Sequence, residues 1–316
     1  MRYALVVLAA CGGDPQTASD AANARDATLV DATPPAAAGC ITDVSPGDHT
    51  FTCGGLQTDV RIPAACEAPG CGLILELHGD TGNGLLMDGH TNLRALGEQH
   101  GYIVVAPSGP PWPGGPGSTW HSSNDATLIA ITTQVRDVFR VDPNKIHVTG
   151  FSRGSFVTWR LLCDHAELFA SAAPGGGDGT DFGEVTCFSN NRVPSRKLPI
   201  LFLMGQLDQA VGYPSLVQIR DAAIASYGLA NHSTISSDTT YHHDRWSGTD
   251  STTVIETFDH GYATVPDGPF GSAQGHCIAG STSDPYAVQY AIPCKLPNSF
   301  VWGEEVMSFF LAHPMS

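Results

Sequence analysis

The stretch that decides the fold of this chain is Lys145-Ile146-His147-Val148-Thr149-Gly150-Phe151-Ser152-Arg153-Gly154-Ser155-Phe156. Its first residues alternate between apolar and polar, as in a β-strand, and apolar residues recur at helical spacing from Phe156 to Leu162. Between the two, Gly150 to Gly154 fits the pattern G-x-S-x-G. A strand, a sharp turn at a serine and a helix form a nucleophile elbow, so the pattern predicts that Ser152 is a nucleophile.

The two glycines of this turn have a physical reason. The backbone is crowded around the serine, and we expect a Cβ at Gly150 or Gly154 to collide with the strand or the helix. The turn holds the Ser152 hydroxyl at a helix N-terminus, whose dipole favours negative charge. A serine hydroxyl is a weak nucleophile at neutral pH, so the chain must also supply a base and an acid that orients it.

Composition limits the possible functions. The chain has 316 residues, 42% of them hydrophobic, which is enough for one large α/β domain with a buried core. Its formal net charge of −16 makes it a poor candidate for binding nucleic acid through phosphates, and we expect no nucleic-acid partner. The same charge says little about a neutral ester or sugar. Few charged residues and many glycines and prolines are typical of secreted proteins.

Nine cysteines indicate an oxidising compartment. Cys11 stands apart, and the simplest assignment of the other eight is four sequence-local disulfides, although a buried free thiol at Cys163 is an alternative. The chain has no C-x-x-C pair and no Cys/His cluster of zinc spacing, so we expect no metal site and no cofactor. The expected pairs are Cys40 with Cys53, Cys66 with Cys71, Cys163 with Cys187, and Cys277 with Cys294.

The N-terminal segment predicts export. Residues 1–11 carry one arginine, a short apolar run and small residues before Cys11, which is typical of a secretory signal. Leu8-Ala9-Ala10-Cys11 resembles the lipobox of bacterial lipoproteins, so we expect Cys11 to be lipidated and to anchor the chain at the cell envelope. An ordinary signal peptide or a truncated start is the alternative. Residues 12–39 are rich in Ala, Asp, Thr and Pro, which predicts a disordered linker before a catalytic domain at 40–316.

Buried strands alternate with amphipathic helices through the rest of the chain. A hairpin is expected at 47–63, and no internal repeat or second domain is visible. The alternation predicts an α/β fold with a mostly parallel central sheet and helices on both faces, and the elbow makes it an α/β-hydrolase fold. The expected strands are 73–77, 102–106, the elbow strand with Ile146 and Val148, 169–172, 199–204 and 253–258, and the expected helices are 93–100, 125–139, 156–162, 214–227 and 300–311.

The acid of a catalytic triad follows the serine in this fold, after a later strand. Asp208 fits, because it comes after an apolar strand and Gly205. Asp221 lies inside the next helix, and Asp178 lies too early, in a glycine-rich loop. We expect Asp208 to orient the catalytic imidazole and to stabilise its protonated form.

Two histidines qualify as the base on their chain position. His260 directly follows the strand 253–258, and His276 lies further on, beside Cys277. The residues alone leave both open. His242 and His243 precede the strand, and adjacent histidines in a strand point to opposite faces, so a metal site there is improbable.

The oxyanion hole needs two backbone N–H groups. One comes from the residue after the nucleophile, Arg153, and the other from the loop after an early strand. His78-Gly79-Asp80 forms that loop here, so the Asp80 N–H is the candidate, with Thr81 next.

These residues resemble the polyhydroxybutyrate depolymerase and feruloyl esterase group of secreted α/β-hydrolases, over about residues 47–310. The long match is Val141 to Gly154, similar to the family's VDPxxIxVTGxSxG, and Gly275-His276 is similar to its GHxxPG, which assigns the base to His276. The chain departs from the group at Arg153, at Ala279 and in an extra loop at 259–274. Further similarities are Pro46-Gly47-Asp48-His49-Thr50, Leu77-His78-Gly79, Gly101 to Gly109, Gly205 to Asp208, and Trp246-Ser247-Gly248.

The resemblance implies a serine carboxylic-ester hydrolase that acts on polyester or on feruloyl and acetyl esters of polysaccharides. Trp120 and Trp246 are candidates for lining its substrate pocket, although packing is the commoner role for such residues. The expected partner is an ester substrate, which can be polymeric, and the chain is expected to be a monomer. The alternative is a non-catalytic surface lipoprotein that uses the same fold as a binding module.

Overall fold

The computed structural model describes residues 35–113, 117–179, 187–189, 192–249, 252–265, 274–281 and 292–315. The predicted signal segment, its Cys11 and most of the predicted linker lie outside these ranges. Within the linker, Ala38 exchanges two backbone hydrogen bonds with Ile41, and Gln134 donates to the Ala38 carbonyl at 2.8 Å. The folded unit therefore includes residues shortly before Cys40.

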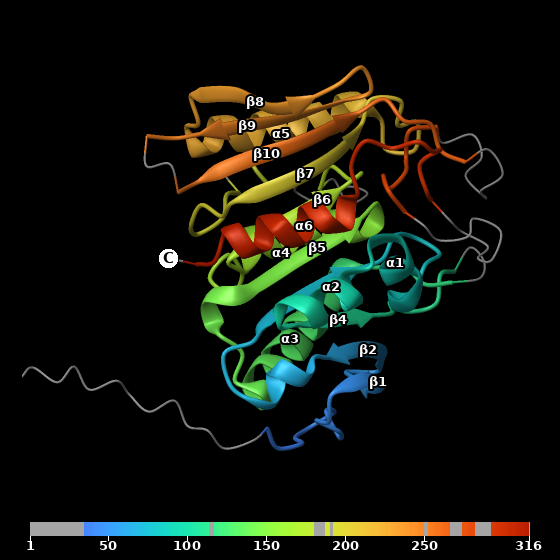
Figure 1. The fold of residues 1–316 in the computed structure, drawn as a ribbon, viewed down its shortest axis with the longest axis vertical. Helices are drawn as coiled ribbons and strands as arrows, with labels where there is room; N and C mark the ends of the chain where they lie inside the picture. Colours follow the sequence, from blue (N-terminus) through green and yellow to red (C-terminus); the bar gives the residue numbers. More distant parts are fainter. Residues whose placement is uncertain are drawn as a thin grey trace, which may run out of the picture. The chain divides into compact units, whose positions relative to one another are not determined.

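One sheet holds the strands of the described residues, in the order β1-β2-β4-β3-β5-β6-β7-β10-β9-β8. The central strands, from β4 to β10, run parallel, and the outer strands pair antiparallel at both edges (Figure 1). The strands are β1 (Gly47–Cys53), β2 (Leu56–Ile62), β3 (Gly72–Leu77), β4 (Tyr102–Pro107), β5 (Ile146–Phe151), β6 (Ser171–Gly175), β7 (Ile200–Gly205), β8 (Asn231–Ser237), β9 (Tyr241–Ser247) and β10 (Val254–His260).

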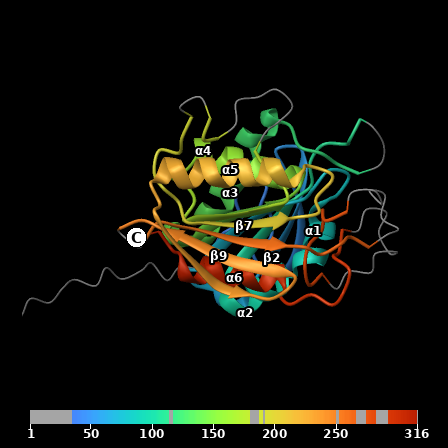
Figure 2. The same cartoon turned by 90° about the horizontal axis from the view of Figure 1, so that it is seen from above.

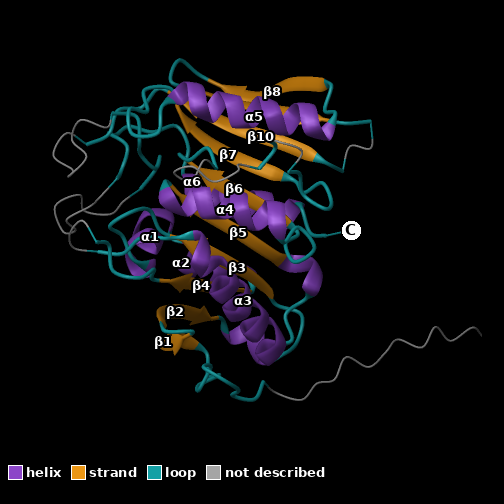
Figure 3. Ribbon diagram, turned by 180° about the vertical axis from the view of Figure 1, so that it is seen from behind, coloured by secondary structure: helices purple, strands orange, loops and turns teal. Residues whose placement is uncertain are grey.

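Helices cover both faces of this sheet, as Figures 2 and 3 show. Apolar residues of α3, α4 and α5 form one buried core with the sheet, and those of α1, α2 and α6 form a second core on the other face. Parallel strands buried on both faces explain the continuous apolar runs in β4 and β7 and the run Leu73-Ile74-Leu75 in β3. The helices are α1 (Gly84–Thr91), α2 (Leu93–His100), α3 (Asp125–Phe139), α4 (Arg153–Asp164), α5 (Tyr213–Tyr227) and α6 (Trp302–Ala312).

The predicted mostly parallel sheet with helices on both faces is confirmed. The predicted helices at 93–100 and 125–139 have the observed bounds, whereas the strand predicted at 169–172 lies slightly later, as β6. The prediction lacked α1 and the antiparallel strands β8 and β9. The residues of β8 are exposed throughout, so the strand carries no apolar alternation that could reveal it.

The four expected disulfides are present: Cys40–Cys53, Cys66–Cys71, Cys163–Cys187 and Cys277–Cys294. The alternative of a free thiol at Cys163 is therefore wrong. None of the helices in the described ranges combines the length and the apolar character that crossing a bilayer requires.

Candidate active site

Ser152 lies in a strained turn between β5 and α4. Its backbone has φ 55° and ψ −118°, which a non-glycine residue rarely adopts. The Ser152 N–H donates to the Gly175 carbonyl at the end of the neighbouring strand β6, at 2.8 Å. The side chain is partly exposed, whereas its neighbours Phe151 and Arg153 are buried. The turn therefore presents the hydroxyl at the carboxyl edge of the parallel strands.

The glycines on either side of Ser152 are required by close backbone contacts. A Cβ at Gly150 would lie 2.5 Å from the Gly154 carbonyl oxygen, and a Cβ at Gly154 would lie 2.1 Å from the Leu77 carbonyl oxygen of β3. Both distances are far below van der Waals contact. The first collision is with the helix and the second with the neighbouring strand, so the turn cannot form with larger residues at these positions.

Asp208 follows β7 at the same edge of the sheet. Its Oδ1 accepts hydrogen bonds from the backbone N–H groups of Ala210, at 2.8 Å, and Val211, at 3.0 Å. Burial acts to raise the pKa of the Asp208 carboxyl, but the hydrogen bond and charge of His276 and these two N–H groups outweigh it, so the pKa is lowered. Asp208 is therefore held as a carboxylate.

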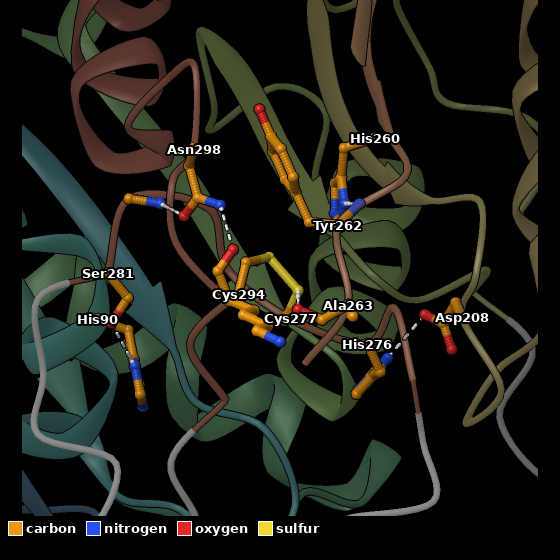
Figure 4. The surroundings of a disulfide bond; sticks show 12 residues. His90, Asp208, His260, Tyr262, Ala263, His276, Cys277, Ser281, Cys294 and Asn298 are labelled. Carbon is orange, nitrogen blue, oxygen red and sulfur yellow. Dashed lines mark hydrogen bonds and ion pairs between the residues drawn. A yellow bond between two sulfur atoms is a disulfide. The ribbon is translucent and has the colours of Figure 1, made fainter. Parts of the chain in front are cut away.

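His276 makes a direct hydrogen bond to this carboxylate. Its Nδ1 lies 2.7 Å from Asp208 Oδ2, and both residues are buried (Figure 4). Two glycines allow their loops to touch, since a Cβ at Gly205 would lie 2.0 Å from the Gly275 carbonyl oxygen, and one at Gly275 would lie 2.4 Å from the Asp208 nitrogen. Gly205, which precedes the acid by three residues, and Gly275, which directly precedes the histidine, thus make the same close contact possible.

The His276 ring also packs beside the elbow. Its centroid lies 4.8 Å from that of Phe151, the residue before Ser152. Gly176, which follows β6, closes the space, because a Cβ there would lie 3.3 Å from His276 Cε1 and 2.8 Å from Phe151 Cε2. The sequence analysis did not single out Gly176. The signal that could have revealed it is the glycine run at 175–177, directly after a strand.

The other histidines considered as bases occupy different positions. His260 is buried at the end of β10, where its Nδ1 accepts the Tyr262 N–H at 3.3 Å and its ring stacks on Tyr262. His243 Nε2 lies 2.9 Å from Glu256 on the α6 side of the sheet, and His242 points to the opposite face. Of the histidines in the described ranges, His276 is the one that is hydrogen-bonded to Asp208.

The loop after β3 faces the serine. A Cβ at Gly79 would lie 3.2 Å from Ser152 Cβ and 3.7 Å from Ser152 Oγ. Thr81 has φ 67°, a conformation that is strained for a β-branched residue, and its N–H donates to the Ser118 carbonyl at 2.7 Å. The Thr81 N–H is therefore engaged elsewhere, which leaves the Asp80 N–H as the candidate donor from this loop.

The buried ring of His78 holds the start of this loop through two hydrogen bonds. Its Nε2 accepts the Gly109 N–H at 2.9 Å, so its Nδ1 carries the proton and donates to the Gly79 carbonyl at 2.7 Å. Burial lowers the pKa of His78 to about 4, so the ring stays neutral. A neutral histidine with both nitrogens bonded to backbone is a structural support.

Arg153 connects the elbow helix to the same loop. Its guanidinium Nε donates to the Trp120 carbonyl at 2.9 Å and lies 3.8 Å from Asp80 Oδ1. Asp80 also accepts a hydrogen bond from the Thr119 hydroxyl. The Arg153 backbone N–H is in the first turn of α4, where such groups have no partner within the helix and point out of its N-terminus.

The structure shows what surrounds Trp120 and Trp246, the two candidates for lining the substrate pocket. Trp120 is fully buried, and its indole N–H donates to the His78 carbonyl at 2.9 Å, so it supports the loop and offers no surface to a substrate. Trp246 pairs with Ile255, which pairs with Ile200 at the amino end of β7, whereas Asp208 follows the carboxyl end. Trp246 therefore lies at the opposite ends of the strands from Asp208. There the guanidinium carbon of Arg220 lies 5.3 Å from the centroid of its ring.

One group of the described residues has the spacing of a metal site. It comprises His260, Cys277 and Cys294, whose ligand atoms lie within 4.8 Å of one another. The two sulfurs are bonded to each other and are not thiolates. The ligand set of a zinc site therefore does not exist in the disulfide form of the protein.

Comparisons with known proteins identify relatives among esterases. No protein-family model matches the chain. Acetylxylan esterase A of Aspergillus awamori is 34% identical over 112 residues, which cover 32% of this chain and 36% of the relative. The putative esterase NocK of Nocardia uniformis is 27% identical over 217 residues, covering 65% and 61%. Poly(3-hydroxyalkanoate) depolymerase C of Paucimonas lemoignei is 29% identical over 133 residues, covering 38% and 31%. The chain thus spans less than two thirds of each of these relatives.

A solved structure supports the fold. The acetyl xylan esterase from Aspergillus awamori superposes with a TM-score of 0.54 at 18% identity, and the match covers 68% of this chain and 93% of that protein. The sheet order, the helices on both faces and the strand-turn-helix at Ser152 agree with that likeness. The chain has the α/β-hydrolase fold, and its relatives in sequence are esterases and a polyhydroxyalkanoate depolymerase.

Proposed function

We propose that the protein is a serine carboxylic-ester hydrolase in which Ser152, His276 and Asp208 form the catalytic triad. The observation that carries the proposal is the 2.7 Å hydrogen bond between buried His276 and Asp208, on a ring that packs against the residue before Ser152. The strained, partly exposed serine at a helix N-terminus supplies the nucleophile. The esterase relatives support the reaction class.

The reaction follows from the chemistry of these groups. His276 donates a hydrogen bond from its Nδ1–H to the Asp208 carboxylate and keeps that proton, so the Nε2 lone pair is free to accept the Ser152 proton as Oγ attacks the ester carbonyl carbon. The oxyanion that forms is stabilised by the N–H groups of Asp80 and Arg153. His276 then returns the proton to the leaving alcohol, which gives an acyl-enzyme. Water attacks the acyl-enzyme by the same steps and releases the acid.

The substrate class that we propose is an ester of a neutral polymer. Acetyl esters of polysaccharides are one candidate, because four relatives are named as acetylxylan esterases. A hydroxyalkanoate polyester is the second candidate, because another relative is named as a depolymerase of that polymer. A net charge of −16 disfavours polyanionic substrates and does not discriminate between these two neutral polymers.

The setting that we propose is the outside of a bacterial cell. The four disulfides are stable in an oxidising compartment, which supports secretion. Lipidation of Cys11 would hold the catalytic domain at the envelope through residues 12–39. The mechanism needs no metal or organic cofactor, and we propose that the protein acts as a monomer.

The test is hydrolysis of p-nitrophenyl acetate, butyrate and octanoate by the full chain and by its Ser152→Ala variant. We expect the wild type to turn over and the variant to lose at least about 10³-fold in kcat, because the nucleophile is removed. The chain-length profile then ranks the acyl groups, and acetylxylan and hydroxybutyrate oligomers are compared next.

A folded wild type that is no faster than Ser152→Ala would refute the esterase proposal. The binding-module alternative would then be supported if a fluorophosphonate failed to label Ser152 while the chain still bound acetylxylan or polyester granules. Labelling of Ser152 together with ester turnover excludes that alternative.

A further inference from the structure

His276 lies on a connecting loop rather than on an element of the sheet. The described part of this loop, residues 274–281, follows β10 along the chain and precedes α6. Before the histidine, the Gln274 carbonyl accepts the Gln209 N–H at 3.0 Å, which attaches the loop to the segment that carries Asp208. The position of the imidazole therefore depends on what holds the loop on the other side.

The next residue, Cys277, is covalently attached to Cys294, and both are almost fully buried (Figure 4). Cys294 donates its backbone N–H to the Ile278 carbonyl at 3.1 Å, and Lys295 donates to the Ala263 carbonyl at 2.7 Å. The disulfide thus joins the segment that carries His276 to the one that leads to α6, and the Lys295 hydrogen bond attaches the latter to the segment that leaves β10.

His260 packs against this disulfide from the end of β10. One of its ring nitrogens lies within 4.8 Å of both sulfurs, and its Nε2 has no hydrogen-bond partner among the described residues. Tyr262 stacks on the His260 ring, and its hydroxyl accepts the Ser299 N–H at 2.8 Å. The disulfide therefore rests on a buried surface at the end of a central strand.

We propose that the Cys277–Cys294 disulfide is a positioning element for the catalytic base, a role that rests on the proposed esterase function. It fixes the backbone one residue after His276, so that Nδ1 stays on Asp208 and the ring stays packed on Phe151, beside Ser152. A misplacement of about 1 Å in a catalytic group can cost about 10²-fold in rate. The other disulfides lack this position, since none of their cysteines adjoins a proposed catalytic residue.

The experiment compares two paired substitutions in the full chain. Cys277→Ala with Cys294→Ala opens the proposed positioning disulfide. Cys40→Ala with Cys53→Ala is the matched control, because that disulfide closes a stretch of 13 residues against 17 and lies at the edge strand β1. Thermal unfolding by circular dichroism sets a temperature at which both variants are folded, and kcat, KM and the pH profile of p-nitrophenyl acetate hydrolysis are measured there.

We expect Cys277→Ala/Cys294→Ala to lose about 10- to 100-fold in kcat with a smaller change in KM and a displaced pH profile. The control is expected to keep its kcat within about twofold and its pH profile, even though its unfolding temperature falls, because a lost disulfide alone destabilises the fold. A folded Cys277→Ala/Cys294→Ala variant with wild-type kcat and pH profile would overturn the proposal. If that variant does not fold, Cys277→Val/Cys294→Ala restores part of the buried volume and takes its place.

A second readout separates this inference from the proposed function. A histidine Nδ1–H bonded to a carboxylate gives a low-field proton resonance, which we expect in the wild type and not in Asp208→Ala. The resonance should persist in the Cys40→Ala/Cys53→Ala control and vanish in Cys277→Ala/Cys294→Ala. If the wild type shows no esterase activity, this pattern still supports the positioning role, and an unchanged resonance in Cys277→Ala/Cys294→Ala refutes it.

Discussion

At the scale of single residues, the candidate site depends on positions where no Cβ fits. Gly150 and Gly154 allow the turn at Ser152, and Gly205 and Gly275 allow the acid and the base to meet. Each glycine removes a specific contact between two backbones. The proposed catalytic side chains can meet because these glycines have no side chains that would keep the backbones apart.

Gly176→Ala tests whether the site also depends on a missing Cβ next to His276. With φ +60° and a Cβ 2.8 Å from the Phe151 ring, the alanine would displace Phe151 and His276. We expect kcat to fall about 10- to 100-fold. Gly212→Ala is the control, because Gly212 has φ +93° but open space around a Cβ. Equal kcat values in the two folded variants would contradict the role of Gly176.

Asp208→Asn tests the carboxylate itself. The substitution removes the charge that holds His276 in its proposed tautomer, and the amide can still accept the Ala210 N–H. We expect kcat to fall about 10²- to 10⁴-fold with little change in the unfolding temperature. Steady-state kinetics and thermal unfolding measure the two effects. The control is Asp221→Asn, an exposed position on α5, which should leave kcat unchanged.

At the scale of elements, β3 carries a buried acid two residues before the loop that faces Ser152. Glu76 is fully buried, and its Oε1 accepts a hydrogen bond from the Thr91 hydroxyl of α1. Burial, and after it the nearby charge of Asp88, raises the pKa of Glu76 well above 4.5. The folded state therefore binds the Glu76 proton more tightly than the unfolded state does.

This shift gives a stability that depends on pH. The raised pKa of Glu76 contributes stability that is complete below the unfolded value of 4.5 and is lost as pH rises through the folded value. Glu76→Gln should therefore flatten the decline of the unfolding temperature toward alkaline pH. Thermal unfolding over a pH series measures it, with Glu67→Gln as an exposed control. A Glu76→Gln curve parallel to that of the wild type would be the contrary result.

At the scale of the whole molecule, the carboxyl ends of the parallel strands bring together residues that are distant in sequence. Parallel strands end on the same side, so the loops after β3, β5, β6 and β7 meet there, and the loop after β10 brings His276 to them. The antiparallel strands β8 and β9 extend the sheet beyond β10. The candidate site therefore lies over the parallel part of the sheet, at the ends of its central strands.

The sequence by itself determined the features that depend on neighbours along the chain. The elbow at Ser152, the strand that leads to Asp208 and the turn at Gly54-Gly55 follow from local periodicity and glycine placement. The four disulfides also joined cysteines that are near in sequence, so the simplest pairing was the observed one. The spacing of apolar residues along an element indicates which of its faces is buried.

Only the tertiary structure decided which distant groups meet. Chain order left His260 and His276 equivalent as bases, and only the family resemblance favoured His276; the contact with Asp208 gives the physical distinction, because the Gly205 and Gly275 backbones pack together. Trp246 is the first residue of a motif that is similar to one of the family, but the register of β9 on β10 places it at the opposite ends of the strands from Asp208. Strand register and loop packing arise from contacts between elements, and no periodicity within one element encodes them.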